Sequence, residues 1–140
     1  MYAYAHVSLV RIFLAAAILI AVVTPTSASP LLKCIVSYAG TPQTITAHPE
    51  INPYLIDAVD IGERFTFKAV MIGKENNIDY IKLYVYFQTR RNDVPIHQAS
   101  YLPPFVFSEE GVMLTPKNYL YAGDVERALE YQCSLQKVVN

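Results

Sequence analysis

The sequence predicts an all-β domain, a small antiparallel barrel or sandwich of about six or seven strands closed by one disulfide. After residue 28 the chain is rich in strand-forming residues and holds nine of its 11 tyrosines and five of its six phenylalanines. Short segments there alternate between apolar and polar residues, and no long segment has the helical period. Cys34 and Cys133 stand near the two ends of this part, where a bridge would join its first and last strands.

The N-terminal 28 residues predict a cleaved signal peptide. Arg11 precedes an apolar run over residues 12–23. As a helix this run reaches about 18 Å, short of the roughly 30 Å hydrocarbon core of a bilayer. Thr26-Ser27-Ala28 supplies small residues for cleavage after Ala28. We expect residues 29–140 to form a single exported β-rich domain, periplasmic or secreted, with no membrane span after cleavage; an uncleaved anchor is the alternative.

The charge balance gives no indication of a nucleic-acid partner. The chain has 11 lysines and arginines against 12 acidic residues, and loss of Arg11 with the signal peptide leaves a net charge of −2 (10 − 12). Nucleic-acid-binding domains carry a basic patch or stripe. The mature domain has neither a basic footprint nor an acidic tail, so we expect no nucleic acid among its partners.

The two cysteines predict a structural disulfide, because two cysteines in an exported domain most simply pair with each other. A redox or metal pair needs close spacing such as Cys-x-x-Cys, which the sequence lacks. The bridge would close a loop of about 100 residues, for which the chain-entropy model gives roughly 4–5 kcal/mol.

The first three expected strands are short and end at turn residues. Residues 34–38 form the first, ended by Ala39-Gly40-Thr41-Pro42, and residues 44–47 are its hairpin partner. A loop with two prolines follows over residues 48–53. Residues 54–61 then predict a third strand that ends at a glycine.

The clearest element is a hairpin of two long alternating strands. Residues 64–72 and 78–89 both alternate, and residues 73–77 join them as a five-residue loop. Residues 96–102 predict the next strand. Pro103-Pro104 ends it, because proline cannot donate to a ladder.

The C-terminal part has two competing interpretations, after an irregular segment expected over residues 105–124. One is a short helix over residues 124–130, with Asp124 as its N-cap. The other is a strand from about Ala128 to Val138, whose period of two places on one face Leu129, Tyr131, Cys133 and Leu135. We favour the strand.

Placing Ile72 opposite Ile78 sorts the hairpin residues onto two faces. One face is apolar and predicts the core: Phe65, Phe67, Ala69, Ile81, Leu83 and Val85, with Phe87 beyond them. The other face is Arg64, Thr66, Lys68, Val70, Tyr80, Lys82, Tyr84 and Tyr86. A one-residue slip would bury three charges, so this second face should lie outside.

The candidate binding residues all lie on this outer face: Arg64, Lys68, Tyr80, Lys82, Tyr84 and Tyr86. Tyrosine offers a wide apolar area with a hydroxyl at its edge, and Tyr and Arg are enriched at binding hot spots. In this register Lys68 faces Lys82, and an anionic partner between them would relieve their repulsion. The alternative is an ordinary strand surface, partly covered by residues 105–124.

No motif for catalysis, metal binding or phosphate binding stands out. His48 and His97 lie on separate segments without Glu or Cys at ligand spacing, so we expect neither a metal nor a cofactor. Asp57, Asp60 and Glu63 form an acidic cluster near a glycine, which is more typical of a solvated turn than of a hydrolytic carboxylate pair.

The sequence resembles two known families in part. Tyr131-Gln-Cys133 resembles the Tyr-x-Cys of an immunoglobulin strand, but seven residues follow Cys133 and the chain has no tryptophan. In size, export and cysteine placement the chain is similar to the small periplasmic lysozyme inhibitors of Gram-negative bacteria, compact β-barrels, but it lacks a Ser-Gly-x-x-Tyr loop. This second likeness is architectural and suggests an inhibitor on size and compartment alone.

Together these observations predict a non-enzymatic exported binding module that recognises a protein or a cell-wall glycan in the envelope or the extracellular space. An inhibitor of a hydrolase is one form of this role. The first alternative is a structural subunit of a cell-envelope assembly, in which the same face pairs with a neighbour by self-association. The second alternative is a small hydrolase that uses the acidic cluster.

Overall fold

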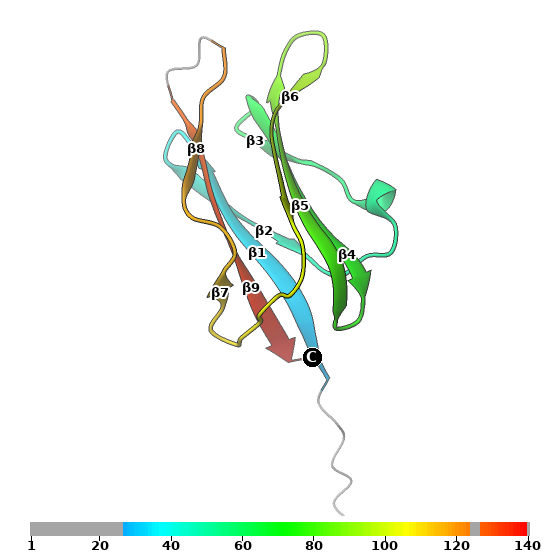
Figure 1. The fold of residues 1–140 in the computed structure, drawn as a ribbon. Helices are drawn as coiled ribbons and strands as arrows, with labels where there is room; N and C mark the ends of the chain where they lie inside the picture. The colour runs from blue at the N-terminus through cyan, green and yellow to red at the C-terminus, as the bar shows by residue number, and fades with distance from the viewer. Residues whose placement is uncertain (1–26, 124–126, 140) are drawn as a thin grey trace, which may run out of the picture.

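Two antiparallel sheets pack face to face as a β-sandwich (Figure 1). The computed structural model describes residues 27–123 and 127–139. Its strands are β1 (Ala28–Tyr38), β2 (Thr41–Ala47), β3 (Val59–Ile61), β4 (Phe65–Lys74), β5 (Asn77–Gln88), β6 (Asp93–Tyr101), β7 (Val112–Met113), β8 (Asn118–Leu120) and β9 (Leu129–Val139). One sheet has the order β2-β1-β9-β7, with β8 also paired to β9, and the other has the order β3-β4-β5-β6.

The predicted all-β sandwich is confirmed. The described residues form nine strands rather than six or seven. The barrel alternative is wrong, because the edge strands of one sheet do not pair with those of the other.

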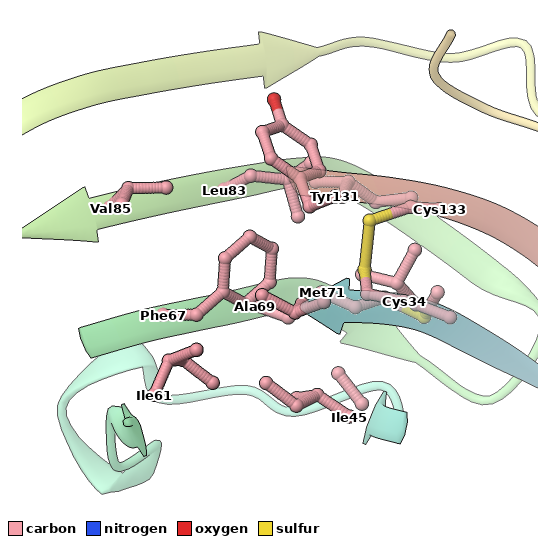
Figure 2. Close-up of a cluster of buried hydrophobic side chains, with 14 of the residues drawn as sticks. Cys34, Ile45, Ile61, Phe67, Ala69, Met71, Leu83, Val85, Tyr131 and Cys133 are labelled. Atoms are coloured by element: carbon pink, nitrogen blue, oxygen red, sulfur yellow. A yellow bond between two sulfur atoms is a disulfide. The ribbon is translucent and has the colours of Figure 1, made fainter. Parts of the chain in front are cut away.

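The core lies between the sheets and follows the period of two along each strand. On β4 and β5 the predicted apolar face points inward, and each of these side chains is at most 4% exposed: Phe65, Phe67, Ala69, Ile81, Leu83 and Val85. Figure 2 shows Phe67 of β4 packed against Tyr131 of β9, with ring centroids 5.3 Å apart. The prediction of which face of the hairpin is buried is therefore confirmed.

The predicted disulfide is present and joins two neighbouring strands of one sheet. β1 and β9 pair along 11 residues, with Cys34 directly opposite Cys133. The two sulfur atoms are 2.05 Å apart, and both side chains are fully buried (Figure 2). The bridge therefore lies in the interior of a hydrogen-bonded ladder and faces the core.

The β4–β5 hairpin differs from the prediction in its turn and its register. β4 extends to Lys74 and β5 begins at Asn77, one residue earlier than expected, so Glu75 and Asn76 alone form the turn. The register shifts between Ile72 and Gly73, and Ile72 lies opposite Tyr80. The predicted register is wrong by two residues. From Phe65 to Val70 and from Tyr80 to Tyr86 the side chains nevertheless stay on their predicted faces, because a shift of two residues equals the period of a strand. Beyond the bulge Ile78 joins the core instead of the outer face.

We expect the Gly73→Ala variant to be destabilised by roughly 1–3 kcal/mol, a typical cost of overpacking. At this bulge an added Cβ would overlap the carbonyl oxygen of Asn77 and lie 2.7 Å from the Cα of Ile78. Both are backbone atoms that cannot move without opening the turn. Urea unfolding measures the difference, and Asn76→Ala, an exposed position in the same turn, should cost less than about 0.5 kcal/mol. Equal costs for the two variants would contradict the bulge geometry.

Other segments differ from the expectations in detail. Residues 54–61, expected as one strand, overlap the 3-10 turn η1 (Pro53–Leu55) and reach β3 only afterwards. Residues 105–124 are less irregular than predicted, since β7 and β8 pair there with β9. At the C-terminal end the strand interpretation is confirmed and the helix over 124–130 is wrong, because β9 begins at Leu129. Asp124 lies outside the described residues.

The predicted signal peptide lies outside the described residues apart from Ser27 and Ala28. β1 begins at Ala28, the residue after which cleavage is predicted. In the part of the chain that the structure describes, no helix is long and apolar enough to cross a bilayer. The disulfide is typical of proteins that fold in an oxidising compartment.

Candidate functional site

Five of the six candidate residues line one hollow on the outer face of the β3–β6 sheet. The hollow has a volume of about 380 Å³, and we call it the tyrosine hollow. Its lining residues are Pro53, Tyr54, Lys68, Val70, Tyr80, Lys82, Tyr84 and Tyr86. None of them belongs to residues 105–123, the described part of the segment expected to cover this face, whose strands β7 and β8 pair with β9 of the other sheet.

Arg64 is the candidate that stands apart from the hollow. It lies in the turn between β3 and β4, where its carbonyl accepts a hydrogen bond from the backbone N–H of Gln88 at 2.8 Å. The residue opposite Tyr86 is Thr66. The predicted pairing of Arg64 with Tyr86 is therefore wrong, and its side chain is exposed outside the hollow.

The register places the two lysines of the hollow diagonally. Lys68 lies opposite Tyr84, and Val70 lies opposite Lys82. The direct opposition of Lys68 and Lys82 expected from the sequence is therefore wrong. Diagonal neighbours across two strands are roughly 7–8 Å apart, so both lysines still line the same hollow.

One wall of the hollow comes from η1, which the sequence analysis missed. Two backbone hydrogen bonds of Glu50, both 3.0 Å long, attach the preceding segment to β4. The chain then leaves the sheet on the side away from the other sheet (Figure 1), and the Asn52 side chain accepts a hydrogen bond from the Tyr54 N–H at 3.0 Å. Tyr54 is 91% exposed beside the hollow. Asn52-Pro53, a pair typical of turns, is the local signal for this excursion.

The two lysines give the hollow a positive charge that no acidic lining residue neutralises. Across residues 27–123 and 127–139, the only ion pair within 4.0 Å is Lys117–Glu130 on the other sheet. Asp93, at the margin of the hollow's own sheet, accepts a hydrogen bond from the Thr66 hydroxyl at 3.2 Å. The ammonium groups of Lys68 and Lys82 are therefore available to an anionic partner.

Aromatic contacts order the side chains along β5. The Tyr84 and Tyr86 rings stack with centroids 6.3 Å apart and planes 21° apart. The Lys82 Nζ lies 5.1 Å from the centroid of the Tyr80 ring, a cation–π distance. All four side chains are half-buried, and Val70 beside them is 3% exposed. Side chains held in this way lose less entropy when a partner binds.

The acidic cluster of the sequence forms a hydrogen-bonded turn. Asp60 accepts a hydrogen bond from the Gln88 side chain at 2.7 Å and another from the Glu63 N–H at 3.2 Å. Asp57 and Glu63 are exposed. These hydrogen bonds close the connection between β3 and β4, and they give the hydrolase alternative no specific support.

A hydrogen bond between His97 and Tyr131 links the two sheets, and the sequence analysis did not predict it. The His97 Nε2 on β6 and the Tyr131 hydroxyl on β9 are 2.7 Å apart. Figure 2 shows this hydroxyl directed out of the apolar cluster, toward the yellow-green β6. Burial lowers the pKa of His97, while burial and the nearby Tyr101 raise the pKa of Tyr131 to about 12.

We expect the free energy of unfolding to fall as the pH falls below 6.5, the ordinary pKa of histidine. Above that pH His97 is neutral in both states. Below it the unfolded chain binds the proton first, because the folded-state pKa is lower, and the fold loses stability until the pH passes that lower value. Urea unfolding at about pH 7.5 and pH 5 should show a weaker pH dependence for His97→Gln. The same pH dependence for the wild type and His97→Gln would contradict the assignment.

A larger hollow of about 560 Å³ lies at one end of the sandwich. Its lining residues are Pro30, Asn76, Asn77, Ile78, Pro103, Pro104, Phe105, Val106, Phe107 and Lys137. It contains one cation and no tyrosine. We place the candidate site in the tyrosine hollow, because that hollow combines two lysines with four tyrosines on a well-paired sheet.

No family model, curated protein or solved structure matches this chain. The chemistry of the site is therefore inferred from its own residues.

Proposed function

We propose that the protein is an exported, non-enzymatic binding module that recognises a protein or a cell-wall glycan through the tyrosine hollow. One observation carries the proposal: four tyrosines and two lysines without an acidic neighbour in the lining converge on a single hollow. Inhibition of a hydrolase is one form that such binding can take.

Export to the periplasm or the medium belongs to the same proposal. The predicted signal peptide and the buried disulfide support it. A partner of the module would then be found outside the cytoplasm.

The residue types of the hollow favour a binding role over that of an ordinary solvent-exposed strand surface. Tyrosine brings large contact area with few rotatable bonds, so it loses little entropy on binding. Lys82 is already held over the Tyr80 ring, and charged groups on a concave surface of one sign attract oppositely charged partners.

Affinity capture from the envelope or extracellular fraction tests the proposal. The oxidised protein is the bait, beside a triple variant with Lys82→Glu, Tyr84→Ser and Tyr86→Ser whose folding is checked by circular dichroism. We expect the wild type to retain a partner that the triple variant loses. Tyr119→Ser with Tyr121→Ser is the matched control, since these tyrosines are 53% and 68% exposed outside the hollow.

Two outcomes would change the proposal. Equal capture by wild type and the triple variant would show that the hollow does not bind the partner. Capture of a second copy of this chain by the wild type alone would favour the structural-subunit alternative.

A further inference from the structure

We propose that the ligand of the tyrosine hollow is an acidic glycan, a short run of sugar rings that carries carboxylate or sulfate groups. The sugar rings pack against the tyrosines, and the acidic groups bind Lys68 and Lys82. This inference rests on the proposed function, because it names the ligand class of the same hollow.

The charge of the hollow calls for an anionic ligand. Lys68 and Lys82 both line it, and no carboxylate lies within 4.0 Å of either among residues 27–123 and 127–139. The two positive charges in the hollow repel each other, and an anion bound between them would turn this unfavourable electrostatic energy into a favourable one. Hydrogen bonds between an ammonium group and an anionic oxygen are also stronger than neutral ones.

The aromatic lining calls for a ligand with flat, partly apolar rings. Tyr84 and Tyr86 present stacked rings, and Tyr54 extends the surface from η1. The C–H face of a sugar ring packs on an aromatic ring, while its hydroxyls find partners in the tyrosine hydroxyls at the edge. A volume of about 380 Å³ lies at the low end of the range for small-ligand sites, roughly 300–1,000 Å³.

The backbone around the hollow disfavours an acidic peptide. An extended peptide gains much of its affinity from main-chain hydrogen bonds to an exposed sheet edge. Four lining residues belong to β5, which is paired with β4 on one side and with β6 on the other. Along β5 recognition must therefore use side chains. On the other side of the hollow the outer edge of β4 offers few main-chain groups among the described residues, because β3 pairs with it as far as Phe67 and Glu50 binds it at Met71 and Gly73. An extended peptide gains little from so short an edge, whereas a sugar needs side chains alone.

Calorimetric titration of the oxidised protein tests the ligand class. The probes are an oligogalacturonate, the same oligosaccharide with its carboxylates methyl-esterified, a sulfated heparin oligosaccharide and a poly-glutamate peptide. We expect at least one acidic oligosaccharide to bind, and the oligogalacturonate and heparin arms separate a carboxylate ligand from a sulfate ligand. If oligogalacturonate binds, its methyl ester should bind about tenfold more weakly or worse, because charge-assisted hydrogen bonds are lost. Added salt should weaken binding as well.

Lysine variants locate the binding. Lys68→Gln and Lys82→Gln should each weaken the acidic oligosaccharide about tenfold. Lys74→Gln is the matched control, because Lys74 is exposed at the end of β4 and outside the hollow. It should stay within about twofold of the wild type, and circular dichroism confirms that all three variants are folded.

Each contrary result has a distinct meaning. Equal binding of oligogalacturonate and its methyl ester would overturn the role of charge. Lysine-dependent binding of poly-glutamate with no binding of either acidic oligosaccharide would assign the hollow to an acidic protein segment. If no probe binds but the triple hollow variant still loses its captured partner, the glycan assignment fails while the proposed function stands. If that capture is also unchanged, both fail.

Discussion

Replacement of Cys34 and Cys133 by alanine should lower the free energy of unfolding by about 4–5 kcal/mol. The bridge spans a sequence separation of 99 residues, and the chain-entropy model gives about 4.7 kcal/mol for a loop of roughly 100 residues. Neither cysteine is exposed, so truncation also loses packing in the core. Since natural domains are stable by about 5–15 kcal/mol in total, the variant should lose a large part of its stability.

Urea unfolding of three proteins separates the two contributions. Reduction of the wild type opens the loop but keeps both sulfur atoms, so the reduced wild type should lie between the oxidised wild type and the double variant. A double variant within about 1 kcal/mol of the oxidised wild type would mean that the 11-residue ladder between β1 and β9 holds without a covalent link.

The Phe67→Ala variant should be destabilised by about 3–5 kcal/mol, the usual cost of truncating a buried phenylalanine. Phe67 is 0% exposed and packs against Tyr131 of the opposite sheet. Removal of its ring leaves a cavity between two sheets, each held in place by its own ladder, and the surroundings cannot collapse fully to fill it.

Ile35→Ala is the matched control, because Ile35 is 52% exposed on the outer face of β1. It should cost less than about 1 kcal/mol. Thermal or urea unfolding measures both variants. Similar losses for Phe67→Ala and Ile35→Ala would contradict the assignment of the core to the space between the two sheets.

The β4–β5 hairpin shows how far alternation predicts a structure. Its period of two identifies the buried face with Phe65 and Phe67, since apolar residues must leave water together. Alternation cannot identify the register, because a shift of two residues leaves every side chain on the same face. The bulge at Gly73 and the two-residue turn determine the register, and so Lys68 lies opposite Tyr84 instead of Lys82.

The part of the tyrosine hollow formed by β4 and β5 was predictable from the sequence, whereas the part formed by η1 was not. Local alternation places Lys68, Lys82 and the β5 tyrosines on one face. Tyr54 joins them only because Glu50 binds the edge of β4 and the chain then loops outward. The contact between His97 and Tyr131 is likewise non-local, since 34 residues separate the two and no pattern links them.

By itself the sequence determined the all-β class, the disulfide and the side of each hairpin strand that faces the core, because these follow from composition, cysteine pairing and the period of a strand. Only the tertiary structure decided that the sheets form a sandwich, that the disulfide lies inside the β1–β9 ladder, and that η1 completes the hollow. The physical reason is the range of the interactions. The alternation of neighbouring residues along a strand is enough to predict which face is buried. Strand order, register and the position of η1 beside the hollow depend instead on hydrogen bonds between segments that are distant in the chain.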